Sequence, residues 1–278
     1  MTQGGFRAAC IQITSGPDPE ANLKTLDALI RQAAADGAAL VLTPETSDLM
    51  AHNRREALAT ARPEADHGGV ERLAALAAKL GIWLSAGSLV VKVTEERLAN
   101  RSFLFDPAGR IAARYDKIHM FDVEIPDGTS YRESRSYRPG DRLVLADLPW
   151  GRLGLTICYD LRFPQLYRAL AQAGADFLIV PSAFTRYTGR AHWETLLRAR
   201  AIETGCFVFA AAQCGDHEAG RKTYGHSLIV DPWGQVLADG GDAVGAVSAT
   251  IDPSAVARAR RMIPALAHGR PYELSRRA

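Results

Sequence analysis

One cysteine occupies a position that suits a nucleophile. Cys158 follows the apolar segment 153–157 and precedes the amphipathic segment 161–170, so it stands on a turn between a strand and a helix. A side chain on such a turn is presented at the end of a sheet, and the next backbone N–H groups face the reacting atom. A buried core thiol is the alternative, because most free cysteines are of that kind. We assign that structural role to the cysteines in or beside strand-like runs, Cys10, Cys206 and Cys214.

A nucleophilic cysteine needs a base, and histidine is the usual partner. The chain has 7 histidines, but none has a distinctive spacing to a partner; His192 opens a helix pattern and His226 lies in a strand pattern. A carboxylate is the other option. Glu45 comes directly after Pro44 at the carboxyl end of a predicted buried strand, where open α/β sheets place their ligand sites. We therefore consider Glu45 as the base.

Two further charged residues stand out by their surroundings. Lys117 is followed by an apolar run, although a lysine that extends its ammonium group into solvent is the alternative interpretation. Glu133 lies in segment 122–141, which the sequence predicts to be a long irregular loop, and such loops are commonly functional. A metal site is not indicated, because the sequence has no HExxH motif, no CxxC pair and no clustered His and Asp residues. No cofactor is expected.

The candidate residues need strands that end close together, and the sequence predicts several. Buried strands are predicted over residues 6–13, 38–42, 82–93, 176–180 and 206–212, and hairpins around the turns 106–109 and 231–234. Helices are predicted from Pro19 to the residue before Gly37, over 70–80 and 161–173, and from 191 onward.

The two halves of the chain contain similar elements in the same order. Alignment of Gly37 with Gly174 places Pro44 on Pro181 and Glu45 on Ser182 without a gap. An internal duplication and a chance similarity of two common helix-Gly-strand units explain this equally well. Two such halves, each a mixed sheet with helices on one face, would pack sheet on sheet. The predicted fold is therefore α/β, a four-layer α-β-β-α sandwich.

Composition excludes several classes of protein. A chain of 278 residues with 47% hydrophobic and 23% charged residues can bury a large core, in one domain or two. The net charge of +2 is too small for a nucleic-acid binder. The longest uncharged stretches, 80–91 and 204–215, have 12 residues each, whereas a membrane span needs about 20. Since the N-terminus has no signal-peptide pattern, we expect a cytoplasmic protein with no membrane or nucleic-acid partner.

Three motifs, taken in chain order, resemble the signatures of a known family. They are Thr43-Pro44-Glu45, Asp116-Lys117-Ile118-His119 and the run LTICYDLRFP at 155–164. Together they resemble the Glu, Lys and Cys signatures of the nitrilase superfamily of carbon–nitrogen hydrolases, and Glu133 is similar to the second carboxylate of that family's site. Segments 117–123, 189–194, 197–203 and 224–227 are most similar to the Nit branch of amidases.

The resemblance implies a nitrilase-like sandwich that hydrolyses amides through a cysteine thioester. In that mechanism Cys158, exposed to substrate, attacks the carbonyl, while Glu45 transfers protons with a desolvated carboxylate whose pKa works near neutrality. Lys117 would stabilise the oxyanion and Glu133 would orient Lys117. The residues that we expect to contact substrate are Tyr159, Arg162 and Phe184.

The Nit branch acts on small-molecule amides, and we expect deaminated glutathione, because the loops 122–141 and 185–189 suit a longer substrate. The alternatives are α-ketoglutaramate, an N-carbamoyl amino acid, or a scaffold for protein interactions without turnover. A distal substrate carboxylate would need a cation, and the candidate arginines in loops are Arg132, Arg135, Arg138, Arg162, Arg186 and Arg190.

The resemblance also implies a homodimer or a larger homo-oligomer. From Ile251 onward the chain has 6 Lys and Arg residues against 2 Asp and Glu residues. We therefore expect a carbon–nitrogen hydrolase domain over 1–250 and a basic arm over 251–278, which is part of the same domain or of its oligomer interface.

Overall fold

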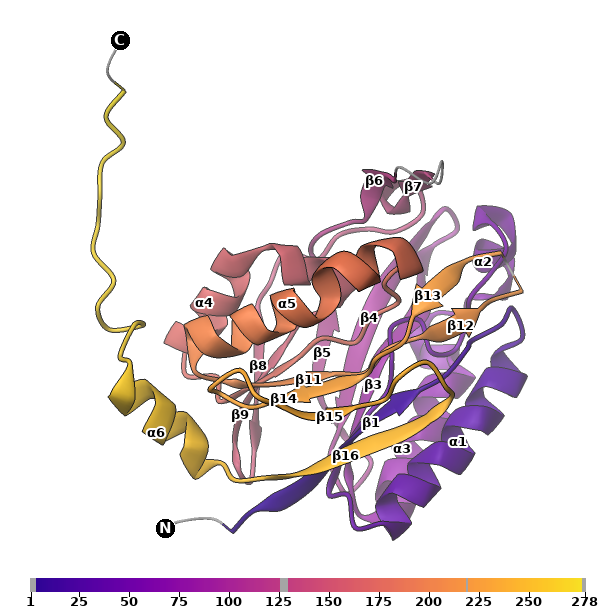
Figure 1. Cartoon of the computed structure of the whole chain (residues 1–278). Coiled ribbons are helices and arrows are strands. Elements are labelled where there is room, and N and C mark those ends of the chain that lie inside the picture. The colour runs from indigo at the N-terminus through magenta and orange to yellow at the C-terminus, as the bar shows by residue number, and fades with distance from the viewer. Residues whose placement is uncertain (1–3, 126–129, 219, 277–278) are drawn as a thin grey trace.

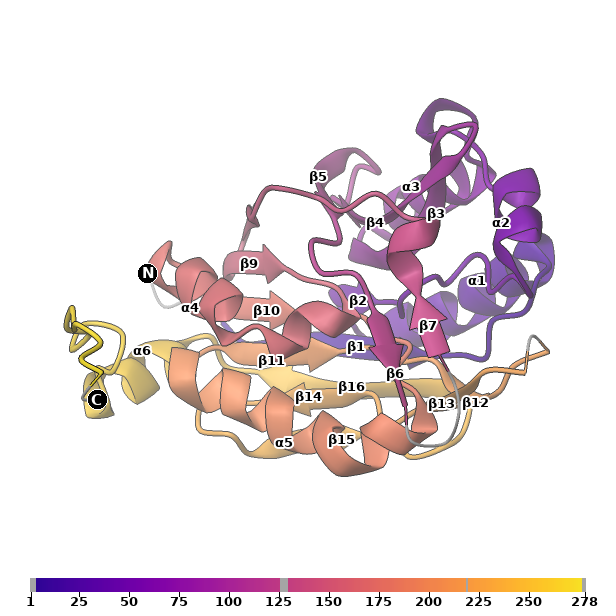
Figure 2. The same ribbon diagram turned by 90° about the horizontal axis from the view of Figure 1, so that it is seen from above.

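The computed structural model describes residues 4–125, 130–218 and 220–276. Two six-stranded sheets lie face to face, and helices cover the outer face of each sheet (Figures 1 and 2). The layers follow the order α-β-β-α, so the predicted four-layer sandwich is confirmed.

The first sheet has the strand order β16-β1-β2-β3-β4-β5 and comes mostly from the N-terminal half of the chain. Its strands are β1 (Phe6–Gln12), β2 (Leu40–Leu42), β3 (Trp83–Thr94), β4 (Arg97–Phe105), β5 (Ile111–Asp116) and β16 (Gly245–Ile251). The helices of this half are α1 (Pro19–Ala35), α2 (Arg54–Thr60) and α3 (Gly68–Leu80). Of these, α1 and α3 pack on the outer face of the sheet.

The second sheet has the order β15-β14-β11-β10-β9-β8. Its strands are β8 (Val144–Leu148), β9 (Gly151–Leu155), β10 (Phe177–Ile179), β11 (Phe207–Ala210), β14 (Leu228–Val230) and β15 (Val236–Asp239). Helices α4 (Pro164–Gln172) and α5 (Arg186–Thr204) cover its outer face, and α6 (Ser254–Met262) follows β16 (Figure 1). The short hairpins are β6 (Asp122–Glu124) with β7 (Ser130–Arg132), and β12 (Cys214–Asp216) with β13 (Lys222–Tyr224).

The two sheets share one pattern of strand pairing, although β16 comes from the end of the chain and β8 directly precedes β9. Read as β16-β1-β2-β3-β4-β5 and β8-β9-β10-β11-β14-β15, successive pairs are antiparallel, parallel, parallel, antiparallel and antiparallel in both sheets. A shared pattern over five pairings favours the internal repeat over a chance similarity of two short segments.

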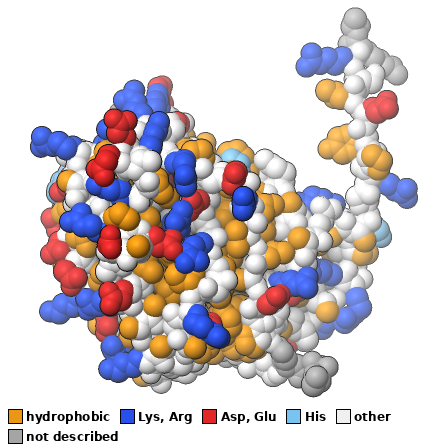
Figure 3. Space-filling view, turned by 180° about the vertical axis from the view of Figure 1, so that it is seen from behind, with side chains coloured by type: hydrophobic (Ala, Val, Ile, Leu, Met, Phe, Trp, Pro, Cys, Tyr) orange, Lys and Arg blue, Asp and Glu red, His pale blue; other side chains and the backbone are white. Residues whose placement is uncertain are grey.

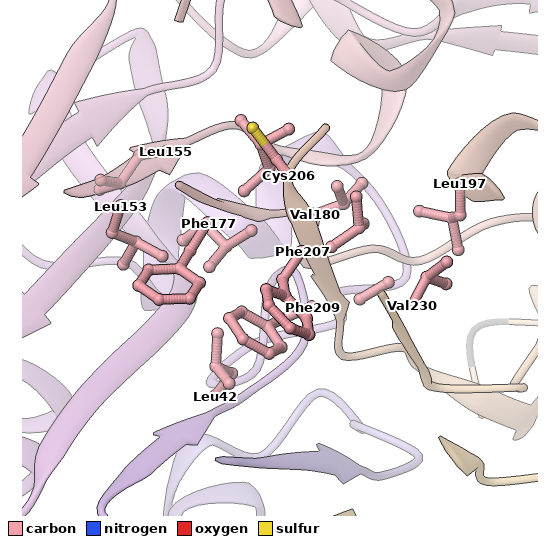
Figure 4. Packing of buried hydrophobic residues seen from close by; sticks show 14 of the residues in the cluster. Leu42, Leu153, Leu155, Phe177, Val180, Leu197, Cys206, Phe207, Phe209 and Val230 are labelled. Atoms are coloured by element: carbon pink, nitrogen blue, oxygen red, sulfur yellow. The ribbon is translucent and has the colours of Figure 1, made fainter. Parts of the chain in front are cut away.

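Apolar side chains from both sheets fill the space between them. Leu42 of β2 belongs to the same buried cluster as Phe177 and Phe209 of the second sheet, and Figure 4 shows Leu42 beside the ring of Phe209. Val41, the neighbour of Leu42, points the other way and packs with α1 and α3. Because β2 is covered on both faces, its carboxyl end is held firmly, and Glu45 follows there.

The ends of β2 and β10 approach each other at Gly87 in β3. A Cβ atom at this position would lie 1.8 Å from the carbonyl oxygen of Thr43 and 2.6 Å from Cβ of Pro181. Only glycine fits this contact, and the register between β3 and β4 shifts here. The loops that begin at Pro44 and Pro181, which the sequence repeat aligned, therefore lie against one another.

Two predicted helix starts were wrong. Residues 158–162 form a 3-10 turn, and α4 begins only at Pro164, because proline is tolerated in the first turn of a helix but not in its interior. Helix α5 begins at Arg186 rather than at 191, since the Thr185 side chain accepts a hydrogen bond from the N–H of Thr188 and caps the helix.

Segment 122–141 is less irregular than the sequence predicted. It contains strands β6 and β7 and a 3-10 turn over Glu133–Arg135, while its residues 126–129 lie outside the described residues. The two strands have only three residues each and are mostly exposed, so they carry no apolar alternation that could reveal them. Elements α2, β8, β16 and α6 were also not predicted.

Candidate active site

Four predicted residues meet in one cavity. Glu45 follows β2, Lys117 follows β5, Cys158 follows β9, and Glu133 opens the 3-10 turn after β7. All four line a cavity of about 440 Å³. The first three come from strand ends at the same rim of the sandwich, which is where parallel strands of this kind place their ligands.

Cys158 lines this cavity and has a constrained backbone conformation. Its φ of 49° is in the left-handed region, which residues with a side chain rarely adopt. Its N–H donates a hydrogen bond of 2.9 Å to the carbonyl oxygen of Pro181, which holds the turn against the loop after β10. The side chain is only 5% exposed, so our expectation of an exposed thiol was wrong. A ligand in the cavity can still reach this buried residue, because Cys158 is one of the residues that line the cavity.

A buried carboxylate holds the turn of Cys158 in place. Asp160 accepts hydrogen bonds from the N–H of Ile157 at 2.9 Å and from the hydroxyl of Tyr115 at 2.7 Å. It also accepts from the backbone N–H of His119 at 3.1 Å and from its ring Nδ1 at 2.7 Å. Asp160 thus connects the loop that carries Lys117 to the turn that carries Cys158.

Lys117 is buried, and its ammonium group binds two buried or partly buried carboxylates. Its side chain is 2% exposed, and Nζ donates to Oε1 of Glu45 at 2.8 Å and to Oε1 and Oε2 of Glu133 at 3.0 and 2.9 Å. Burial alone would lower the pKa of Lys117, but the charges of Glu133 and Glu45 raise it well above the usual lysine value. Lys117 is therefore an ammonium ion at neutral pH, and the solvent-extended alternative is wrong.

Glu45 is held through both of its oxygens. Oε1 accepts from Lys117 and also from the amide Nδ2 of Asn100 at 2.8 Å, while Oε2 accepts from the backbone N–H of Ala183 at 2.8 Å. The carboxylate thus links three strand ends in one fixed orientation. Such an arrangement places a proton acceptor without a reorganisation cost during reaction.

The charges around Glu45 decide which group carries the proton. Burial would raise the pKa of Glu45, but the charges of Lys117 and Arg221 and a hydrogen bond from the thiol of Cys158 bring it below the usual value. Burial and the charge of Glu45 raise the pKa of Cys158. The expectation of a Glu45 pKa near neutrality was therefore wrong. The resting site pairs an ionised carboxylate with a protonated thiol.

Glu133 and Asn100 complete the surroundings of Lys117. Glu133 Oε2 accepts a hydrogen bond of 2.6 Å from the N–H of Phe121, which fixes the carboxylate beside Nζ. Asn100 Nδ2 lies 3.3 Å from Glu133 Oε1, so the amide bridges both glutamates. The sequence prediction missed Asn100, which lies before the hairpin predicted around the turn 106–109. Nothing in its surroundings marked it, because Arg101 and Ser102, which follow it in β4, are also polar.

The predicted substrate contacts fall in two connected places. Tyr159 and Phe184 line the cavity, and Tyr159 also lines an outer groove of about 1090 Å³. Arg162 lies in that groove, with its guanidinium carbon 5.4 Å from the ring centroid of Phe184 and a nitrogen 3.3 Å from Nδ1 of His192.

The predicted arginines separate in the structure. Arg132 lines the cavity, and Arg162, Arg186 and Arg190 line the outer groove. Arg138 lies beside Asp116 at a different pocket. Arg135 is not among the described residues that line the cavity or the groove. Two further arginines, Arg54 and Arg221, line the cavity and were missed, since nothing in their sequence surroundings marks them.

The described residues form neither a metal-binding cluster nor a helix that could span a membrane. Within residues 4–125, 130–218 and 220–276, no group of three or more His, Cys, Asp or Glu side chains is arranged to hold a metal ion. No helix among these residues is both long enough and apolar enough to span a membrane.

Comparison with known proteins places the chain in a family. The sequence model of the carbon-nitrogen hydrolase family matches residues 7–261. The deaminated glutathione amidase of Yersinia enterocolitica is 43% identical over 265 residues, which cover 94% of this chain and 92% of that protein. The crystal structure of the Caenorhabditis elegans NitFhit protein is similar with a TM-score of 0.91 and 42% identity, over 97% of this chain and 66% of that one.

A third relative is an amidase whose active site cysteine carries a covalent adduct. A mutant of the amidase from Nesterenkonia sp. AN1, with a TM-score of 0.78 and 29% identity, covers 93% of this chain and 98% of that one. Its structure contains the product of Michael addition of acrylamide at the active site cysteine. The resemblance predicted from the three motifs is thus confirmed by sequence and by fold. The chain belongs to the carbon-nitrogen hydrolase family and is a hydrolase of carbon–nitrogen bonds.

Proposed function

We propose that this protein hydrolyses the amide bond of deaminated glutathione through a thioester on Cys158. The observation that supports this most is the buried contact of Lys117 with Glu45, in the cavity that also holds Cys158. The curated relative named above acts on deaminated glutathione by its name, and a cysteine is the reactive group in the Nesterenkonia amidase.

In the first half of the reaction, Cys158 attacks the amide carbonyl. Because the thiol is protonated and Glu45 is ionised in the resting site, the proton passes to Glu45 as the carbon–sulfur bond forms. The oxyanion of the tetrahedral intermediate lies between the ammonium of Lys117 and the N–H of Tyr159. Each such donor contributes roughly 3 kcal/mol to transition-state stabilisation.

Collapse of the intermediate completes the acylation. Glu45 returns the proton to the amine nitrogen, the carbon–nitrogen bond breaks, and the amine leaves the acyl thioester behind. Glu45 then removes a proton from water, which attacks the thioester. As the carbon–sulfur bond breaks, Glu45 gives this proton to the sulfur, and the acid and the thiol are released. Throughout, Glu133 keeps a negative charge beside Lys117, so this lysine stays protonated while Glu45 alternates between its two forms. No step needs a cofactor.

The size of the site supports a peptide-like amine as leaving group. The cavity at Cys158 continues past Tyr159 into the outer groove, where Arg162 lies against Phe184. We assign substrate contacts to Tyr159, Arg162 and Phe184. The alternative substrate α-ketoglutaramate releases only ammonia and needs no groove.

A substrate panel tests this proposal. We expect cysteinylglycine release from deaminated glutathione with a kcat/KM well above that for ammonia release from α-ketoglutaramate or an N-carbamoyl amino acid. Wild-type enzyme mixed briefly with substrate and quenched with acid should show the acyl group on Cys158 by intact mass and peptide mapping. A higher kcat/KM for another member of the panel would make that compound the proposed substrate. Absence of turnover with all of them would favour a scaffold for protein interactions.

We also propose that the protein is a homo-oligomer and that residues 251–278 form an arm at its interface, beside a hydrolase domain over 1–250. Figure 3 shows the C-terminal tail extending away from the body, and Tyr272 and Leu274 on it are 94% and 86% exposed. Ile202 and Ile263 border one small hollow and are more than half exposed. Exposed apolar groups of this kind favour contact with a second copy.

We propose a cytoplasmic location as well. In the described part of the chain all four cysteines are free thiols, which suits a reducing compartment.

A further inference from the structure

Arg221 reaches the cavity from a hairpin that is firmly attached to both halves of the molecule. It directly precedes β13, and its carbonyl accepts a hydrogen bond from the N–H of His217 at 2.8 Å. The buried ring of His217 donates from Nδ1 to the carbonyl of Ser15 at 2.8 Å, and its Nε2 accepts from the hydroxyl of Thr223 at 2.7 Å. The backbone N–H of Tyr224 donates to Phe184 at 3.0 Å. The position of Arg221 is therefore fixed.

The guanidinium group of Arg221 is oriented but not neutralised. One nitrogen donates to the carbonyl oxygen of Ala183, and the guanidinium carbon lies 5.4 Å from the ring centroid of Tyr131. Its Nε is buried and finds no hydrogen-bond partner among the described residues. No carboxylate of the described chain lies within ion-pair distance of it. A fixed cation with an unused donor in a ligand cavity suits an anionic group of the ligand.

The position of Arg221 relative to Glu45 indicates which part of a substrate it meets. Ala183 connects the two residues, because its N–H donates to Glu45 and its carbonyl accepts from Arg221. The charge of Arg221 also helps to lower the pKa of Glu45. Since Glu45 must protonate the departing amine, the amine portion of the substrate lies on this side of the cavity.

We propose that Arg221 binds a carboxylate on the amine portion of the substrate. This inference rests on the proposed amide hydrolysis and narrows its substrate class to amides whose leaving amine carries an acid group, such as a short peptide. Arg162 lines the outer groove and not the cavity, so it is a separate cation from Arg221. Primary amides, which release ammonia, make no use of Arg221.

The test compares two substrates that differ only in that carboxylate. One is deaminated glutathione, and the other is the same molecule with its terminal glycine as the carboxamide. We expect wild-type kcat/KM to favour the acid by roughly 10- to 100-fold, mainly through KM, as for a hydrogen bond between charged groups. Arg221→Leu should bring the ratio close to one, because the loss on the acid substrate exceeds any loss on the carboxamide. Arg221→Lys should keep part of the preference.

Arg135→Leu is the control, because it removes one positive charge from an exposed side chain that lines neither the cavity nor the outer groove. It should retain the wild-type ratio. A preference for the acid that persists in Arg221→Leu would overturn the proposal. An equal loss of kcat/KM on both substrates would also overturn it, and would show that Arg221 acts on the charge of Glu45 instead.

Failure of the proposed function gives a different result. If wild-type enzyme does not cleave deaminated glutathione, that substrate is wrong, and the same pair is prepared with an acyl group that the enzyme accepts, joined to glycine or to glycinamide. A preference for glycine that disappears in Arg221→Leu still supports the role of Arg221, whereas equal rates in wild type contradict it.

Discussion

The side-chain amide of Asn100 donates to Glu45 at 2.8 Å, on the same carboxylate oxygen that accepts from Lys117. The orientation of the amide follows, since its oxygen cannot face two carboxylates. Asn100 is buried in β4, and the N–H of Lys117 donates to its carbonyl oxygen at 3.0 Å. One residue thus places the lysine through its backbone and the glutamate through its side chain.

Substitution of Asn100 should therefore affect catalysis more than substrate affinity. We expect Asn100→Leu to lower kcat by about 10- to 100-fold, which corresponds to the loss of one hydrogen bond to a charged group. Asn100→Asp should place a third carboxylate at Lys117 and move the acid limb of the pH profile upward. Ser102→Ala, two residues along the same strand, is the control. Similar kcat values for both Asn100 variants and wild type would show that the bridge is dispensable.

Cys158 and Cys10 should respond in opposite ways to replacement by alanine. Cys158→Ala removes the nucleophile and should abolish amide hydrolysis with little effect on the melting temperature, because the thiol borders the cavity. Cys10 is packed between the sheets, so Cys10→Ala should cost about 1 to 2 kcal/mol of folding free energy and leave kcat nearly unchanged. Thermal unfolding and hydrolysis measured on both variants check this, and residual turnover by Cys158→Ala would refute the thioester route.

The pH dependence of kcat/KM should be unusually flat. Activity needs Glu45 ionised, and its lowered pKa places the acid limb below the usual glutamate range. It also needs Lys117 protonated, and its raised pKa moves the alkaline limb above the usual lysine range. We expect little change from roughly pH 6 to pH 9, measured with a substrate whose own charge is constant there. A limb with an apparent pKa near 6 or 7 would contradict the ionised resting carboxylate.

Lys117→Met should destabilise the protein in a pH-dependent way. It leaves Glu45 and Glu133 buried without their common cation, at a cost of about 3 to 5 kcal/mol at neutral pH. Without the lysine the pKa of Glu45 rises, so the deficit relative to wild type should shrink as the pH falls and the carboxylates become protonated. Urea unfolding at pH 7 and pH 5 measures this. An equal deficit at both values would point to lost packing rather than charge.

Self-association should be visible by light scattering at micromolar concentration. We expect a homodimer or larger assembly, and expect that Ile202→Glu together with Ile263→Glu shifts it toward monomer, because both side chains are exposed around one hollow. Leu237→Glu, at an exposed apolar position of β15, is a comparison outside that hollow. A monomeric wild-type protein would remove the proposed interface.

The sequence was informative where a residue type suited to catalysis stands at a recognisable position. Glu45, Lys117, Glu133 and Cys158 were found because each stands in a recognisable motif or an unusual local setting. Asn100 and Arg221 were missed because their roles arise only when the fold brings β4 and the β12–β13 hairpin close to the loop that carries Glu45. The proton positions could not be predicted either. They depend on the distance between Lys117 and Glu45, two residues 72 positions apart.

The shared pairing pattern of the two sheets makes activity dependent on how the sheets pack together. The scaffold is present twice, but the chemistry is present once: Pro44 leads to Glu45, whereas the equivalent Pro181 leads to Ser182. The base and lysine come from one copy and the thiol from the other, so neither copy contains a working set. Turnover therefore reports on the docking of the two sheets, and separation of the sheets extinguishes it even while each sheet keeps its own hydrogen bonds.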